Sequence, residues 1–142
     1  MKILDIRNAI TKKLNSNGHK IYYENIDKVK KPCFFINLVD YNKEFNTFYR
    51  EKKRITFDLL YFPKEEKMPN TEIITALEQI DEEFEVMGTK TLRVQDRSLN
   101  LKNTFINITD QVGHYIFDIE LFDIYGKPID YELMNDLNLK FK

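Results

Sequence analysis

The chain has 142 residues, the length of one ordinary domain. Its composition, 42% hydrophobic and 32% charged, is close to that of globular proteins and excludes wholesale disorder. No apolar run reaches the roughly 20 residues that cross a bilayer. The start, Met1 to Asp5, lacks the pattern of a secretory signal, so we expect synthesis for the cytoplasm. The single cysteine, Cys33, excludes an internal disulfide, and its apolar neighbours predict a buried thiol.

The charge is unevenly distributed along the chain. The formal net charge of −1 argues against a dedicated nucleic-acid binder. Residues 1–54 carry 13 Lys/Arg against 6 Asp/Glu, a net of +7, whereas residues 55–142 carry 9 against 17, a net of −8. Two explanations remain open: copies of the chain meet head to tail, or the fold interleaves the two portions and cancels the asymmetry.

Two segments have the period of an amphipathic helix. The first covers about residues 2–15 and ends before Gly18. The second covers about residues 70–84, with Asn70 or Thr71 as its cap and Gly88 as its end. The apolar stripes are Ile3, Ile6, Ile10 and Leu14 in the first helix, and Ile73, Ile74, Leu77, Ile80 and Phe84 in the second.

Strands are predicted at about 20–24, 32–41, 55–62, 91–95, 99–109 and 114–125. The segment 55–62 is nearly apolar apart from Thr56 and Asp58, which favours a central strand. Residues 42–53 are polar and predict a hairpin loop or splayed strand ends, and a turn is expected at 111–113. We expect one buried face on the strand 99–109, from Leu101, Phe105, Ile106 and Ile108. In the last strand the core side is expected to hold Tyr115, Phe117, Ile119 and Leu121.

The resulting order is α-β-β-β-α-β-β-β plus a C-terminal tail. It predicts an α+β fold, an antiparallel or mixed β-sheet with two helices packed on one face. We expect a single domain over residues 1–128 and a separate tail over 129–142. In the tail Leu137, Leu139 and Phe141 alternate with polar residues, as in a strand that either returns to its own sheet or extends to a neighbouring subunit.

Signatures of catalysis and metal binding are missing from the sequence. The glycines are isolated, and neither His19 nor His114 has a Cys or His at metal-ligand spacing. Cys33 lies between Pro and Phe, with little to activate a thiol for a Cys–His pair. The remaining cluster of carboxylates at a helix end is typical of a solvated face: Glu82, Glu83 and Glu85. We expect no enzyme, no metal and no cofactor.

Two charged patches are candidate interfaces. The first is a basic run beside two aromatic residues. Three roles are open for it: it keeps a loop soluble, it contacts an acidic protein surface, or it binds nucleic acid. The second is the acidic segment 64–85, with a net charge of −6. One hypothesis is a ring in which the basic run of each subunit meets the acidic helix of the next. The candidate interface residues are Arg50, Lys52, Lys53 and Arg54, with Glu82, Glu83 and Glu85, and with Leu137, Leu139 and Phe141 of the tail.

Two strings and the acidic helix that follows them resemble a known family. The strings are Lys31-Pro32-Cys33-Phe34-Phe35-Ile36 and Arg54-Ile55-Thr56-Phe57-Asp58-Leu59-Leu60-Tyr61-Phe62-Pro63. Over about residues 1–125 the chain resembles the phage tail terminator, or tail completion, proteins of prophages in Gram-positive bacteria. This resemblance implies a mixed α+β domain and carries no catalytic motif.

The resemblance also implies a function. Such proteins form a ring, typically of six subunits, on the head-proximal end of the tail tube of a phage, a defective prophage or a tail-like bacteriocin. The ring stops tube polymerisation and offers the surface that the head joins. Expected partners are further copies of the chain, the tail tube protein, and sheath and head-connector proteins, with no membrane and no nucleic acid. Assembly in the host cytoplasm and a place in the virion tail follow. The alternatives are another head–tail joining or neck protein, or a small non-viral protein-binding module.

Overall fold

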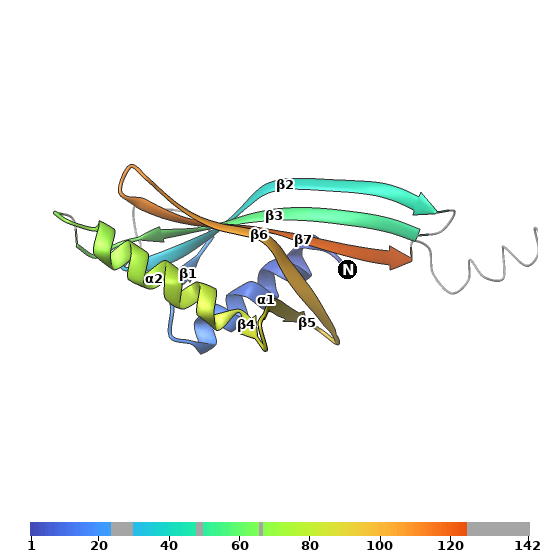
Figure 1. The fold of residues 1–142 in the computed structure, drawn as a ribbon, viewed down its shortest axis with the longest axis horizontal. Helices are drawn as coiled ribbons and strands as arrows, with labels where there is room; N and C mark the ends of the chain where they lie inside the picture. Colours follow the sequence, from blue (N-terminus) through green and yellow to red (C-terminus); the bar gives the residue numbers. More distant parts are fainter. Residues whose placement is uncertain (24–29, 48–49, 66, 125–142) are drawn as a thin grey trace, which may run out of the picture.

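The computed structural model describes residues 1–23, 30–47, 50–65 and 67–124 (Figure 1). Within these residues the strands form one seven-stranded sheet in the order β1-β2-β3-β7-β6-β5-β4. The pair β1–β2 is parallel and the other neighbours are antiparallel, so the sheet is mixed. Both helices lie on one face, which confirms the predicted α+β class and order. The elements are α1 (Ile3–Ser16), β1 (Ile21–Tyr22), β2 (Cys33–Thr47), β3 (Arg50–Phe62), α2 (Asn70–Glu83), β4 (Glu85–Val86), β5 (Thr89–Val94), β6 (Arg97–Thr109) and β7 (Val112–Ile124).

The core lies between the two helices and the middle of the sheet. Most of the predicted helix stripes are fully buried, whereas Ile74 is exposed. Aromatic rings fill the centre: Phe84 stacks on Tyr115 with ring centroids 6.2 Å apart, and Phe117 lies 5.9 Å from Phe84. Apolar surface removed from water here is the main source of stability. The buried stripes are Ile6, Ile10 and Leu14 of α1, Ile73, Leu77 and Ile80 of α2, and, as predicted, Tyr115, Phe117, Ile119 and Leu121 of β7.

The sequence predicted the end of α1 correctly but the cap of α2 incorrectly. Helix α1 ends as expected, with Gly18 in the left-handed region at φ +89°. For α2 the predicted cap is wrong: Pro69 occupies the N-cap position and no side chain caps it. Instead the carboxylate of Glu72, in the first turn, accepts the backbone N–H groups of Lys64 and Glu65 at 2.7 and 3.0 Å. This carboxylate therefore ties the helix start to the preceding loop.

The predicted extent of α2, to about residue 84, is correct, but Gly88 does not end the helix. The helix ends at Glu83, and Gly88 lies in the turn between β4 and β5 with φ +85°. The short strand β4, which the sequence did not indicate, pairs with β5 at residues 85–86. Periodicity gives no warning of this strand because a two-residue strand is too short to show a pattern.

In the segment predicted as a hairpin loop or splayed strand ends, 42–53, the described residues 42–47 and 50–53 instead continue two paired strands. β2 and β3 stay paired from Asn42↔Arg54 to Phe45↔Glu51. Opposite charges across the strands take the place of apolar pairs: Glu44 faces Lys52, and the Nζ atom of Lys43 lies 3.3 Å from a carboxylate oxygen of Glu51. Cross-strand charge pairs support a ladder in the way that apolar pairs do, so polarity alone did not signal a loop.

The hairpin of β6 and β7 differs from prediction at its turn and on its outer strand. The turn is formed by Asp110 and Gln111, both with positive φ, as in a two-residue hairpin loop, whereas Gly113 belongs to β7. On β6 the pairing shifts between Lys102 and Phe105, beside Asn103 at φ 54°. Leu101 is buried as expected, but the shift turns Phe105 to the open face, where it is largely exposed. Ile106, also predicted as buried, lies on the helix side and is exposed as well.

Candidate interaction surfaces

A three-stranded ribbon extends past the helices at one end of the sheet (Figure 1). It consists of residues 42–47 of β2, 50–54 of β3 and 120–124 of β7, which are paired in that order. Phe122 and Ile124 expose apolar side chains on it. The ribbon therefore offers surface without helices to cover it.

A cluster of charged groups closes the base of the ribbon on the helix side. The carboxylate of Asp123 accepts the N-terminal ammonium of Met1 at 3.0 Å and Arg97 at 2.6 Å, and lies 3.3 Å from the Nζ atom of Lys53. Lys53 also donates to the carbonyl of Met1 at 2.7 Å. Burial alone would raise the pKa of Asp123, but these three donors outweigh it and hold that pKa below the usual range.

The structure divides the predicted basic run between two faces. Since side chains alternate along β3, Lys53 points to the helix side, where its charge is used within the chain. The other three side chains lie on the opposite, open face. There Arg54 pairs with Asp118 at 3.0 Å, and the guanidinium of Arg50 lies 4.6 Å from the ring centre of Phe122. Lys52 is half-buried beside them. The run is thus part of a strand and not a solvated loop.

The acidic candidates lie apart from this basic run. Glu82 and Glu85 are exposed at the end of α2 and on β4, whereas Glu83 pairs with Nε2 of His19 at 3.0 Å. Among the residues that the structure describes, no ion pair joins these acids to the basic run. Ion pairs such as Arg54–Asp118 instead link the positive and negative portions of one chain, because the fold interleaves them. The tail candidates Leu137, Leu139 and Phe141 lie outside the described residues, as does the proposed boundary at 128.

The open face carries a polar network at its centre that the sequence analysis did not single out. Asp118 accepts hydrogen bonds from Thr56 at 2.5 Å and from Arg54 and Asn103 at 3.0 Å each. Burial would raise the pKa of Asp118, but these donors lower it overall. A carboxylate that is buried on the uncovered face of a sheet needs such donors to remain charged.

A second carboxylate on the same face has the opposite balance. Asp58 is 7% exposed and contacts Nδ1 of His114 at 2.8 Å, while its other oxygen has no hydrogen-bond partner. Burial raises the pKa of Asp58, and His114 only partly opposes that effect. The signal for this site was present in the sequence: Thr56 and Asp58 are two residues apart in an apolar strand and therefore share one face.

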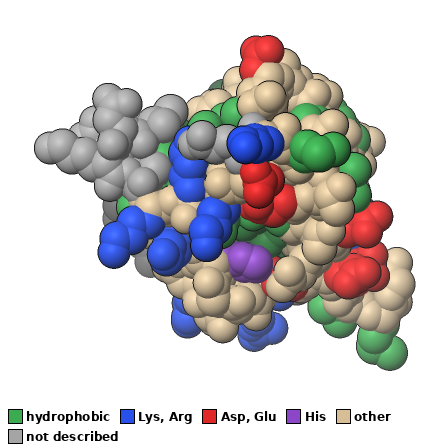
Figure 2. Space-filling model, turned by 90° about the vertical axis from the view of Figure 1, so that its left-hand side faces the viewer, with side chains coloured by type: hydrophobic (Ala, Val, Ile, Leu, Met, Phe, Trp, Pro, Cys, Tyr) green, Lys and Arg blue, Asp and Glu red, His purple; other side chains and the backbone are tan. Residues whose placement is uncertain are grey.

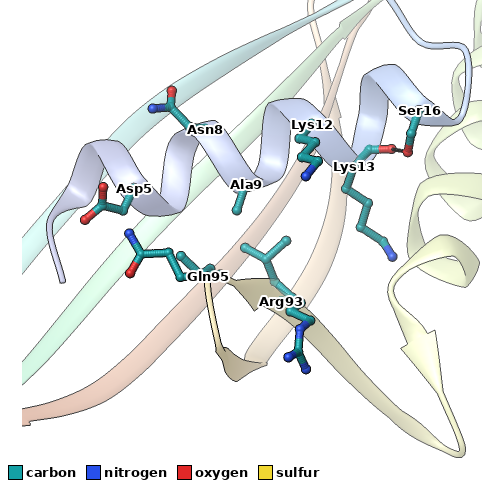
Figure 3. A pocket seen from close by; sticks show the side chains of 10 residues that line it. Asp5, Asn8, Ala9, Lys12, Lys13, Ser16, Arg93 and Gln95 are labelled. Atoms are coloured by element: carbon teal, nitrogen blue, oxygen red, sulfur yellow. Dashed lines mark hydrogen bonds between the residues drawn. The ribbon is translucent and has the colours of Figure 1, made fainter.

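A cavity of about 660 Å³ opens between α1 and β5 (Figure 3). Lys13 of α1 and Arg93 of β5 extend from it in the same direction, and Lys12 adds a further positive charge. Asp5 is the acid at its edge. The lining includes no nucleophile paired with a base. Throughout the described ranges, no group of three or more His, Cys, Asp or Glu could hold a metal ion, and no helix is long and apolar enough to cross a membrane.

The end of the molecule opposite the ribbon is charged (Figure 2). Lys and Arg gather on one side of this end, and most acidic side chains lie on the other. Lys31, Glu65 and Asp110 line a shallow cavity of about 210 Å³ there, beside Phe62 at the end of β3. Nearby, Cys33 is buried as predicted, and burial raises the pKa of its thiol. Both ends of the sheet therefore carry charged side chains, and they differ in which residues they expose.

A family model described as phage tail terminator protein matches residues 5–130. The chain belongs to the phage tail terminator family. This confirms the resemblance to the phage tail terminator family that the two sequence strings indicated, and it places the protein among the structural components of phage tails. No curated protein matches the chain. A tail terminator is a structural protein, and this fits the expectation that the chain is not an enzyme.

Proposed function

We propose that this tail terminator caps the head-proximal end of the tail tube as a ring of six copies, stops tube polymerisation and forms the surface that the head joins. The observation that carries the proposal is the family match over residues 5–130. Its partners are further copies of the chain and the tail tube protein, with sheath and head-connector proteins on the finished particle. Assembly takes place in the host cytoplasm.

The shape supports a cap with two different sides. A cap must bind one end of a tube and still refuse another tube subunit, which requires unlike surfaces. The ribbon end presents three paired strands with Arg50 beside the exposed Phe122, whereas the opposite end presents a shallow cavity lined by Lys31, Glu65 and Asp110. Contacts between unlike patches of identical subunits close into a ring when the rotation between them is right.

Disruption of the gene in the producing strain, followed by electron microscopy of induced particles, tests the proposal. We expect overlong, headless tubes of variable length, and we expect an intact gene copy supplied in trans to restore the uniform length. Tails of normal length with detached heads would instead assign the protein to head joining at the neck. Unchanged particles would overturn a role in the virion.

The number of copies is tested separately. Light scattering of the purified chain should give the mass of six copies. Negative-stain images of tail ends should show a ring with six-fold symmetry. A ring of another order would correct the count and leave the capping function in place.

A further inference from the structure

Within the described residues, parts of the long strands β2 and β6 extend beyond their short neighbours β1 and β5 and have outer edges that no strand covers. β1 pairs with β2 only at Phe34 and Phe35, so within the described chain the outer edge of residues 37–44 has no neighbour. β5 pairs with β6 only at residues 97–100, which leaves the outer edge of residues 102–109 without a neighbouring strand among the described residues. We name these the β2 edge and the β6 edge. Each presents backbone N–H and C=O groups that a further strand can bind.

Both edges expose apolar side chains beside these backbone groups. On the β2 edge Leu38, Val39 and Tyr41 are 43%, 53% and 39% exposed. On the β6 edge Phe105 and Ile106 are 52% and 40% exposed. Edge strands usually carry proline or outward charges that discourage pairing. Neither edge contains proline, and the charges are few: Asp40, Lys43 and Glu44 on the β2 edge and Lys102 on the β6 edge. These are features of a strand that pairs with another chain.

The polarity of the strands suits a continuous sheet across two copies. β2, β3, β7 and β6 alternate in direction because each neighbouring pair is antiparallel. When the β6 edge of one copy lies beside the β2 edge of the next, the new pair is antiparallel as well. The two edges lie on opposite borders of the sheet, the β2 edge toward the ribbon end and the β6 edge toward the β6–β7 turn (Figure 1). Such a contact joins unlike surfaces and can therefore be repeated from copy to copy.

Charge favours unlike edges over like ones. The β2 edge carries Asp40 and Glu44, while its Lys43 is turned toward Glu51 on β3. The β6 edge carries no acid, and its Lys102 is paired with Glu120 on β7 at 3.0 Å. Two β2 edges would bring acidic side chains together, whereas a β2 edge against a β6 edge brings no like charges together.

We propose that the subunits of the ring are joined by antiparallel pairing of the β2 edge of one copy with the β6 edge of the next. This inference rests on the proposed function for the closure of the ring. Alternation places Tyr41, Ile106 and Ile108 on the helix side of the extended sheet, where an aromatic ring meets β-branched side chains. The same alternation places Asn42 and Asn107 on the open face.

Disulfide trapping tests the pairing with the full chain. Single variants on the β2 edge are Asp40→Cys, Asn42→Cys and Glu44→Cys, and on the β6 edge Phe105→Cys and Asn107→Cys, all on the open face. Each β2 variant is mixed with each β6 variant and oxidised mildly, both in solution and during assembly on tails. Facing residues of adjacent antiparallel strands are within the Cα separation that a disulfide requires. The native Cys33 is 1% exposed and does not interfere.

We expect at least one mixture to give about ten times more linked dimer than the control mixture of Asn42→Cys with Glu78→Cys, because an interface raises the effective concentration of two thiols. Glu78 is an exposed residue of α2, away from both edges. A chain that carries both cysteines of the mixture that gives the most linked dimer should form a ladder of linked multimers that ends in a closed ring. Single β2 variants should give no dimer above the control.

The contrary outcomes are distinct. Dimers of a single β2 variant would show that like edges meet. Preferential linkage of Asn42→Cys to Phe141→Cys would show that the C-terminal tail binds the β2 edge. Either result overturns the pairing, as do rings in which none of the mixtures is linked. Rings without any linked mixture would overturn the strand pairing and leave the capping function in place. A linked ladder together with unchanged particles after gene disruption would overturn the capping function and leave the pairing in place.

Discussion

The two halves of β3 and β7 hold together in different ways. Where the helices cover the sheet, the inward positions are apolar and fully buried, as at Leu59 and Phe117. In the ribbon the same face of the same strands carries Glu51, Lys53 and Asp123, which are paired with one another or with the N-terminus. A strand therefore does not need an apolar face along its whole length. The covered half anchors it, and charge pairs continue the ladder outward.

The largest expected effect separates buried apolar contacts from exposed ones. Phe117→Ala should lower the free energy of unfolding by about 3–5 kcal/mol, because the ring is fully buried among Phe57, Phe84 and Tyr115. Tyr41→Ala, on the exposed half of β2, should change it by no more than about 0.5 kcal/mol. Urea unfolding of the monomer with an unchanged slope measures both. Similar losses for the two variants would contradict the contrast between the halves.

A smaller effect tests the charges at the base of the ribbon. Asp123→Asn should cost about 1–3 kcal/mol near neutral pH, since the carboxylate accepts the N-terminal ammonium and Arg97 and lies beside Lys53. The pKa of Asp123 is lowered in the folded state, so its contribution is present above the unfolded pKa and lost as the pH falls through the folded pKa. Wild type and variant should therefore converge in acid. Urea unfolding across this range measures the difference.

The matched control is Asp96→Asn, which removes an exposed carboxylate from the turn between β5 and β6. It should leave the free energy of unfolding within about 0.5 kcal/mol of wild type. An equal loss in both variants would mean that the cluster around Asp123 adds nothing to the ribbon.

The sequence predicted the covered half of the molecule well and the uncovered parts poorly. Helical periodicity found α1 and α2, and the alternation in β7 identified its buried residues, because in these elements the pattern is a direct consequence of burial. Residues 42–53 of the ribbon were predicted as a hairpin loop or splayed strand ends because the groups that replace apolar contacts lie on different strands, as with Lys53 and Asp123. Phe105 was assigned to the core because the register shift beside it depends on pairing and not on local pattern.

The same difficulty applies to the interaction surfaces. The basic run was visible as charge, but its division between two faces follows only from its place in a strand. The uncovered edges of β2 and β6 could not be found before the strand order was known, because an edge is a property of the sheet. The network around Asp118 needs Asn103, which the register shift brings to the same face.

The smallest expected effect compares the two carboxylates of the open face. Burial raises the pKa of Asp58, so its charged form destabilises the folded state: stability is fully present below the unfolded pKa and is lost as the pH rises through the folded pKa. The variant Asp58→Asn removes the charge. It should therefore gain on wild type as the pH rises toward neutral, by less than about 1 kcal/mol since the contact with His114 opposes the effect of burial.

Asp118→Asn is the matched variant with the opposite sign. Three donors lower the pKa of Asp118, so this variant should fall further behind wild type as the pH rises. Thermal unfolding of both variants at several pH values measures the two trends. If both moved in the same direction, the difference between the two sites would not come from their hydrogen-bond donors. Opposite trends would show that, on a face without helices, the number of donors decides whether a buried carboxylate stabilises the sheet.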